Sequence, residues 1–218
     1  ALLGFLWFYV SYHYPKMIPT PAAVWAKFLN VLEKPIMRVS YWGHILVSLR
    51  RILIALICSW VLGISFGTLI GWNKKMNAFF GSIFEIIRPI PPLAWIPLAI
   101  LWFGIGEKYK YFLIFIAAFV PFTLNAFAGA SHVDKQLVGA ARMLGASKSQ
   151  LFFEIVVPAA VPSIFSGAQV ALSNSWMTML AAEMVCATEG VGWIIIAGQS
   201  VNDMTQMIAG MLAIGIVG

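Results

Sequence analysis

Long apolar runs separated by short polar turns dominate the pattern of this chain. Four interior runs contain no Asp, Glu, Lys or Arg: 52–72, 89–106, 111–131 and 155–182. Each is close to or above the roughly 18–20 residues that a membrane-spanning helix needs. The uncharged runs 1–15 and 204–218 stop at the chain ends and are interpreted as partial spans. The pattern predicts an all-α, polytopic membrane helix bundle of about six transmembrane helices, the first and last truncated.

The composition excludes an ordinary soluble domain. Hydrophobic residues make up 61% of the chain, charged residues 10%, and the mean hydropathy is +0.89, whereas soluble domains are about 45–50% apolar. We therefore expect one transmembrane domain over 1–218, in contact with the lipid bilayer and without a cleavable signal peptide. The net charge of +6 is attributed to basic residues at membrane ends and headgroups, so no nucleic-acid partner is predicted.

Catalytic and metal-binding patterns are missing from the sequence. Cys58 and Cys186 do not have metal-ligand spacing, and the three histidines are isolated. The sequence contains no His-Glu-x-x-His, Gly-x-Ser-x-Gly or Walker A motif. We predict no enzyme activity, no catalytic or metal-binding residues, and no cofactor bound by this chain.

Two shorter segments interrupt the series of spans. The stretch 22–34 places Val24, Phe28 and Leu32 on one side of a predicted helix that lies along the membrane surface. The run 190–202 is too short to span and is interpreted as a re-entrant or surface segment.

The richest polar loop covers residues 132–157. Asp134 is placed to cap a first short helix, and Gly145 suits the left-handed conformation that ends one. The residues 147–150, Ser-Lys-Ser-Gln, form a predicted capping box that begins a second helix. A proline, Pro158, is expected to restart the chain into the next span. The pattern predicts a helix–turn–helix elbow with small residues at its bend; a plain interfacial loop is the alternative.

This elbow resembles the Glu-Ala-Ala loop of the membrane subunits of bacterial ABC importers. The family pattern is Glu-Ala-Ala, three residues, Gly, nine residues, Ile-x-Leu-Pro. The chain departs from it at Gly139, which replaces the Glu, and at Val157, which replaces the Leu. The matching positions are Ala140, Ala141, Gly145, Ile155 and Pro158.

Further matches extend over essentially the whole chain and are similar to the nitrate/sulfonate/taurine-type branch. They comprise the residues 19–21, 48–51, 88–94, 97–98, 101–104 and 182–184. The resemblance implies a type I ABC importer permease in the bacterial cytoplasmic membrane, with 132–157 as a cytoplasmic coupling-helix loop. Its implied contacts with the ATPase are Gly139, Ala140, Ala141, Arg142, Leu144, Gly145, Ala146 and Ser147.

The resemblance also implies partners and a mechanism. Two copies of this chain would enclose the path, as a homodimer, and two separate ATPase subunits would bind ATP and Mg and dock on the two elbows. An extracytoplasmic substrate-binding protein would deliver the solute. The implied substrate is a small anion or organic sulfonate, such as nitrate, taurine or an alkanesulfonate. Bicarbonate or a vitamin precursor of the thiamine-pyrimidine type is the alternative.

Polar residues within the spans are candidates for the translocation path. In the fifth span, one face of the predicted helix, an arc of roughly 100°, carries five polar or aromatic residues: Ser166, Gln169, Ser173, Trp176 and Glu183. The third span adds Glu85, Arg88, Trp95 and Trp102, although prolines interrupt it. The predicted path residues are Arg88, Trp95, Gln169, Ser173, Trp176 and Glu183. The alternative is that Arg88 pairs with Glu85 and the tryptophans serve in packing, with Glu183 paired or kept off the axis.

Three glycines at spacing four favour close helix packing in the second span. Gly63, Gly67 and Gly71 form a double Gly-x-x-x-Gly ridge. A secondary transporter or channel would be expected to show internal repeats, and comparison of the two halves reveals none. Co-purification of an ATPase distinguishes an importer subunit from that alternative.

Overall fold

The chain folds into two compact units of helices. The structure is a computed structural model that describes residues 2–14, 18–33, 35 and 39–218. One unit comprises 1–51 and 179–218, and the other comprises 52–178. Two long helices, α3 (Tyr41–Trp72) and α10 (Val157–Cys186), contribute residues to both units. All regular elements of the described ranges are helices, which confirms the all-α prediction.

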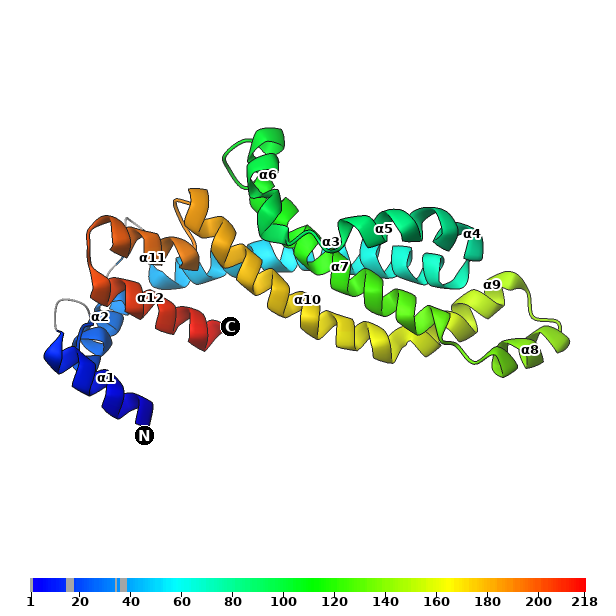
Figure 1. The fold of residues 1–218 in the computed structure, drawn as a ribbon, viewed down its shortest axis with the longest axis horizontal. Coiled ribbons are helices and arrows are strands. Elements are labelled where there is room, and N and C mark those ends of the chain that lie inside the picture. The colour runs from blue at the N-terminus through cyan, green and yellow to red at the C-terminus, as the bar shows by residue number, and fades with distance from the viewer. Residues whose placement is uncertain (1, 15–17, 34, 36–38) are drawn as a thin grey trace. The chain divides into compact units, whose positions relative to one another are not determined.

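The unit 52–178 contains the predicted interior spans (Figure 1). Besides parts of α3 and α10, it holds α4 (Lys74–Met76), the π-helical turn η1 (Asn77–Gly81), α5 (Ser82–Ile87), the 3₁₀ turn η2 (Pro92–Trp95), α6 (Ile96–Phe103), α7 (Lys108–Ser131), α8 (Lys135–Met143), α9 (Lys148–Gln150) and the π-helical turn η3 (Leu151–Val156). By length and composition, the described residues contain three helical stretches able to cross a membrane, or four if a bent pair counts as one span.

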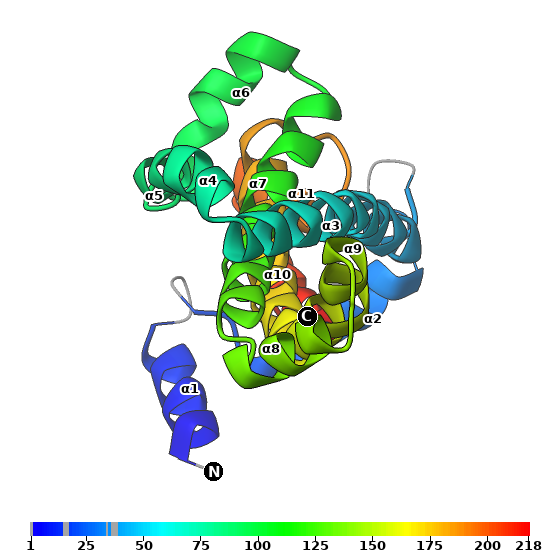
Figure 2. The ribbon, with the colours of Figure 1, turned by 90° about the vertical axis from the view of Figure 1, so that its right-hand side faces the viewer.

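The third predicted span is broken at its prolines, which confirms the interruption that the sequence predicted. The segments Lys74–Ile87 and Pro92–Phe103 meet at a bend of 85°, and α6 leaves the direction of α5 in both views (Figures 1 and 2). Pro91 and Pro92 cause the break, since proline lacks the N–H that an α-helix requires and disfavours helical geometry in the residue before it. Before the bend, Phe80 of η1 and Phe84 of α5 pack against Phe66 of α3.

Helix α7 lies at the centre of this unit because small residues allow α3 and α10 to approach it. A Cβ atom added at Gly63 would lie 2.9 Å from the Cβ of Phe122, and one added at Gly71 would lie 2.7 Å from the carbonyl oxygen of Phe127. On another side of α7, Gly129 packs on Ala160 of α10. Because hydrocarbon gives little hydrophobic drive for association, close backbone contact supplies much of the attraction between spans.

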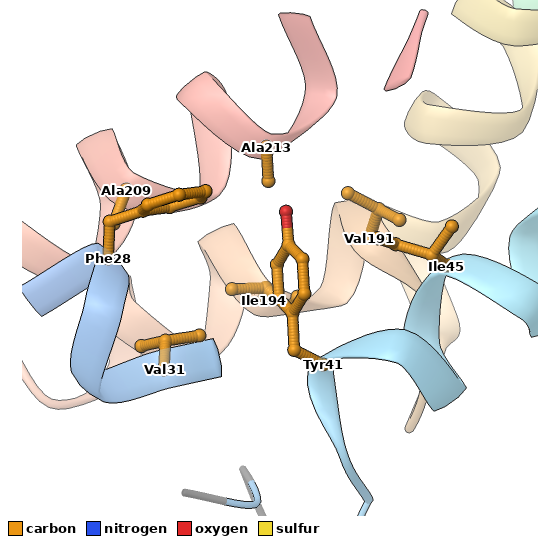
Figure 3. Close-up of a cluster of buried hydrophobic side chains, with 8 residues drawn as sticks. All are labelled: Phe28, Val31, Tyr41, Ile45, Val191, Ile194, Ala209 and Ala213. Atoms are coloured by element: carbon orange, nitrogen blue, oxygen red, sulfur yellow. The ribbon is translucent and has the colours of Figure 1, made fainter. Parts of the chain in front are cut away.

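The other unit packs amphipathic and apolar helices around a buried hydrophobic cluster. It holds α1 (Leu2–His13), α2 (Pro21–Glu33), the start of α3, the end of α10, α11 (Val191–Ser200) and α12 (Met204–Val217). Phe28 and Val31 of α2 meet Tyr41 and Ile194 in the buried cluster drawn in Figure 3. The predicted amphipathic helix is therefore present, with Val24 and Phe28 buried and Leu32 packed against the cluster. Lys34, the last residue of the predicted stretch, lies outside the described residues.

An ion pair joins α2 to the beginning of α12. The Lys27 ammonium lies 2.7 Å from Oδ2 of Asp203, and Oδ1 of Asp203 accepts a hydrogen bond from the Gln206 N–H as the α12 cap. Burial alone would raise the pKa of Asp203. The bonds from Lys27 and the backbone outweigh it and hold the pKa of Asp203 below its ordinary value.

We expect Gly67→Leu to disrupt the packing of α3 on α7. The added side chain would meet the Thr123 carbonyl and the Cβ of Ala126, 2.8 Å away, at a cost of about 1–3 kcal/mol from overpacking. The yield of monodisperse protein on size exclusion and its thermal midpoint in detergent should both fall. Ser65→Leu, at an exposed position of the same helix, is the matched control. Equal behaviour of the two variants would contradict the packing role of the ridge.

Candidate functional site

Helix α8 forms the first arm of the elbow, and both of its ends are fixed locally. Oδ1 of Asp134 accepts a hydrogen bond from the Gln136 N–H at 2.8 Å. At the other end Gly145 has φ of 85°. The N–H groups of Gly145 and Ala146 donate to the carbonyls of Arg142 and Ala141, each at 3.0 Å. This pair of bonds is the Schellman pattern, so the predicted cap and the predicted left-handed glycine are both confirmed.

The second arm begins at the predicted capping box and continues directly into α10. Oγ of Ser147 accepts from the Gln150 N–H at 3.3 Å, and the Gln150 side chain accepts from the Ser147 N–H at 2.9 Å. From Lys148 the chain stays helical through η3 into α10 (Figure 1). The expectation that Pro158 restarts a separate helix is therefore wrong. A π-helical turn precedes Pro158, and such turns accommodate local changes in the hydrogen-bond ladder.

The two sides of α8 differ in what they meet. At about 100° per residue, one side carries Lys135, Val138, Gly139 and Arg142, and all four line a hollow against the ends of α3 and α7. The opposite side is exposed and apolar. It carries Leu137, which is 52% exposed, and leads to Leu144, which is 89% exposed.

The predicted coupling residues divide between these two sides. Gly139 and Arg142 face the hollow, whereas Ala140 and Leu144 are exposed away from it. Ala141 and Ala146 are half-buried, and their backbone groups, with that of Gly145, close the turn. Ser147 is exposed and caps α9.

The polar face predicted on α10 is exposed in this chain. Gln169 and Ser173 are exposed, and Trp176 is half-buried. Asn174 lies beside Ser173, is also exposed, and was not among the predicted residues. Polar side chains on a spanning helix are costly against lipid, so this face requires water or a protein partner.

Arg88 and the predicted tryptophans lie in different surroundings. Nη1 of Arg88 lies 3.0 Å from Oε1 of Glu85, in a pair that is largely exposed. Arg88 also lines a hollow of about 270 Å³ formed with residues of α7 and α10, among them Asn125 and Asn174. Trp95 instead packs with Trp102 and Phe112, at ring separations of 6.5 Å each. The 85° bend removes the single helical stripe that sequence spacing suggested for Arg88, Trp95 and Trp102.

Glu183 belongs to the other compact unit and is buried in a hydrogen-bonded pocket. Its Oε1 lies 2.7 Å from Nη1 of Arg51 and accepts from the Ser48 hydroxyl at 2.7 Å. Its Oε2 accepts from the Gly192 N–H at 2.9 Å. Both charged side chains are 0% exposed. The carboxylate is therefore neutralised and held by donors from α3 and α11.

The same pocket fixes the turn between α10 and α11. Arg51 also donates to the Glu189 carbonyl at 3.0 Å. The Val191 N–H donates to the Ser48 hydroxyl at 3.0 Å, and the Gly190 N–H donates to Nδ1 of His44 at 3.1 Å. The sequence predicted no role for Arg51 or Ser48 beyond their match to the family pattern at 48–51. The signal that could have found them is their i, i+3 spacing at the start of an apolar run.

Comparison with known proteins identifies relatives for most of the chain. The family described as "binding-protein-dependent transport system inner membrane component" matches residues 59–218. The taurine transport system permease protein TauC of Escherichia coli K12 is 35% identical over 204 residues, which are 93% of this chain and 74% of TauC. The nitrate import permease protein NrtB of Synechocystis is 38% identical over 175 residues, covering 80% of this chain and 64% of NrtB.

A solved structure supports the same fold. Inward-facing MetNI, a methionine ABC transporter, contains a chain that matches with a TM-score of 0.66 and 21% identity. The match covers 78% of this chain and 85% of that one. At this identity the similarity concerns the fold alone.

The Glu183 pocket gives a direct test. Glu183→Gln removes the closer of the two carboxylates that pair with the buried Arg51 guanidinium and leaves only that of Glu189, 3.6 Å from Nη2. Breaking a buried pair costs up to about 3–5 kcal/mol. We expect a lower thermal midpoint of the purified protein and reduced uptake that is alike for every substrate. Glu154→Gln, at an exposed position, is the control.

A double-mutant cycle separates pairing from a direct role in transport. If pairing is what matters, Arg51→Gln combined with Glu183→Gln should be more stable than the sum of the single effects predicts. A Glu183→Gln protein of normal stability that loses uptake of one cation alone would instead show that the carboxylate contacts the solute.

Proposed function

Because this chain belongs to the family of binding-protein-dependent transport system inner membrane components, we propose that it pairs with a second copy of itself to carry a small anion across the membrane. As a family member it is the transmembrane permease of an ABC importer, located in the inner membrane, and it is not itself an enzyme. Nucleotide binding belongs to a partner ATPase. Two ATPase subunits, with ATP and Mg, and an extracytoplasmic binding protein complete the proposed assembly.

The elbow is the observation that supports coupling to an ATPase. Its exposed side presents Leu137 and Leu144 beside the small residue Ala140. Small and apolar residues allow another protein to approach closely and to bury the exposed leucine side chains. Gly139 replaces the family's glutamate, and this position faces the hollow instead of the exposed side. In the proposed complex the leucines, with the small residues between them, make the contact with the ATPase groove.

The continuous helix after the elbow supports a mechanical role. Residues from Lys148 stay helical through η3 into α10, so a displacement of the second arm is transmitted along the helix that carries Gln169 and Ser173. In the proposed cycle, ATP binding draws the two ATPases and both elbows together. The helices then rock, and the path opens to the other side of the membrane. ATP and the loaded binding protein each favour one state of this bistable bundle.

The polar face of α10 supports a path between two copies. Gln169, Ser173 and Asn174 are exposed in the single chain, and a second copy placed against this face would enclose a polar passage. Arg88, at the edge of the neighbouring hollow, adds a positive charge near the proposed route. Trp95 and Trp176 would line or support the path through packing.

The relatives and the charges favour an anionic or zwitterionic substrate. The names of relatives refer to taurine, nitrate, aliphatic sulfonates and bicarbonate. Glu183 is neutralised by Arg51, so it adds no fixed negative charge that would repel an anion. We propose nitrate, taurine or an alkanesulfonate as the substrate class. Bicarbonate or a cationic vitamin precursor is the alternative within the same architecture.

The first test is whether an ATPase accompanies the chain. We expect the tagged chain, expressed with its genomic neighbours, to bring down an ATP-binding subunit in equal copy number. Leu144→Asp should abolish that association, since it puts a charge at the centre of the proposed apolar contact. Lys75→Asp, at an exposed position outside the elbow, should not. A functional chain that transports without any ATPase would establish a secondary transporter or channel instead.

The second test concerns the bend itself. Gly145→Val places a β-branched residue at φ of 85°, which costs about 1–2 kcal/mol or more and misplaces the two arms. Substrate-stimulated ATP hydrolysis and uptake by the reconstituted complex should fall, while the isolated ATPase stays active. Gly145→Asn, which tolerates the left-handed conformation, should retain most of the activity. Normal stimulation in the valine variant would contradict a coupling role for this turn.

A further inference from the structure

A hollow of the unit 52–178 lies behind the elbow, on the side opposite the exposed leucines. It has a volume of about 660 Å³ and is bordered by the ends of α3 and α7 and by the inner side of α8. Four of its lining residues are cations, and none is a carboxylate: Lys74, Lys135, Arg142 and Lys148.

The four cations have no ion-pair partner within the part of the chain that the structure describes. Asp134, the nearest carboxylate in the sequence, does not line the hollow and accepts the capping bond from Gln136. The carbonyl ends of α3 and α7 carry partial negative charge, which balances only a fraction of four full positive charges. The hollow therefore has a strong excess of positive charge.

The remaining lining residues indicate where along the membrane this charge lies. Trp72 ends α3, and tryptophan is enriched at the level of lipid headgroups. Gly71, Ala130, Val133 and Val138 provide an apolar wall. A ligand that suits both parts has an anionic phosphate next to an apolar tail.

We propose that this hollow binds the phosphate headgroup of an anionic phospholipid from the cytoplasmic leaflet. This inference rests on the proposed function, which places the elbow at the cytosolic face. The phosphate would join Lys135 and Arg142 of α8 to Lys74 after α3 and to Lys148 of the second arm. A bound lipid would thereby fix the inner side of α8 against the spans while the outer side contacts the ATPase. Anionic lipid becomes a determinant of how firmly the elbow transmits motion.

Lipid binding is tested on the complete permease–ATPase complex. Native mass spectrometry of the complex titrated with phosphatidylglycerol or with phosphatidylcholine measures the affinity for each. We expect a clear preference for phosphatidylglycerol. Each of Lys74→Gln and Lys135→Gln should weaken that binding about fivefold, the change that corresponds to roughly 1 kcal/mol for one basic residue at an anionic surface. Lys75→Gln, whose exposed side chain does not line the hollow, should change it little.

A functional assay compares the complex in nanodiscs of phosphatidylcholine with and without phosphatidylglycerol. Substrate-stimulated ATP hydrolysis should be higher with phosphatidylglycerol, and Lys74→Gln with Lys135→Gln should remove that difference while the ATPase stays bound. Inorganic phosphate added to phosphatidylcholine discs should not replace the lipid. If it does, the occupant is a soluble anion and the lipid inference is overturned.

Two further results would also overturn the lipid proposal. Loss of the ATPase subunit from the Lys74→Gln/Lys135→Gln complex in both lipids would mean that these cations face an acidic surface of the ATPase. Equal affinity for the two lipids in a wild-type complex that still couples transport to ATP would refute the lipid site alone. Failure of the wild-type chain to bind any ATPase would instead refute the proposed function.

Discussion

Hydrocarbon cannot accept or donate hydrogen bonds, so each polar group that this chain carries into the membrane needs a partner from protein or water. The chain meets this constraint in two contrasting ways. Glu183 is enclosed by Arg51, Ser48 and the Gly192 N–H, whereas Gln169 and Ser173 of the same helix are left exposed. The enclosed group stabilises the protein, and the exposed groups indicate a face that a second copy and the transported solute would complete.

Close helix packing depends on the same absence of water. The glycines of α3 bring its backbone against α7, and Gly129 of α7 does the same for α10. A bundle held by such contacts has few adjustable side chains at its contact surfaces. Its helices are therefore expected to move as rigid bodies, without local rearrangement of side chains. The direct continuation of the second elbow arm into α10 fits that behaviour, because it joins the proposed ATPase contact to a rigid element of the bundle.

Sequence reasoning predicted the features that depend on local chemistry. Three of the interior spans follow from uncharged runs, and the Asp134 cap, the Gly145 turn and the Ser147 capping box follow from the conformational preferences of single residues. The features it missed depend on how elements meet. The bend at Pro91 and Pro92 was recognised as an interruption of the helix, but its 85° angle is set by tertiary packing. Pro158 was expected to restart a helix, yet the π-helical turn before it keeps the helix continuous.

The surroundings of the predicted path residues also depend on contacts between elements, which the sequence did not predict. Helical spacing placed Glu183 on a stripe with Gln169 and Ser173, but its two side-chain partners, Ser48 and Arg51, lie more than a hundred positions away in the sequence. Asn125 and Asn174 enter the hollow beside Arg88 only because α7, α10 and the broken third span converge there. No periodicity within one helix encodes that convergence.

The central claim is that ATP binding moves the elbows of two copies of this chain, and a distance measurement tests it most directly. Spin labels at Ser149→Cys, an exposed position of the second arm, would be placed in the reconstituted complex after replacement of Cys58 and Cys186. Pulsed electron–electron double resonance would then measure the distance between the two labels with and without ATP. The account predicts one dominant distance between the two copies that shortens when ATP binds. A distance that stays unchanged while the complex hydrolyses ATP and transports would contradict it.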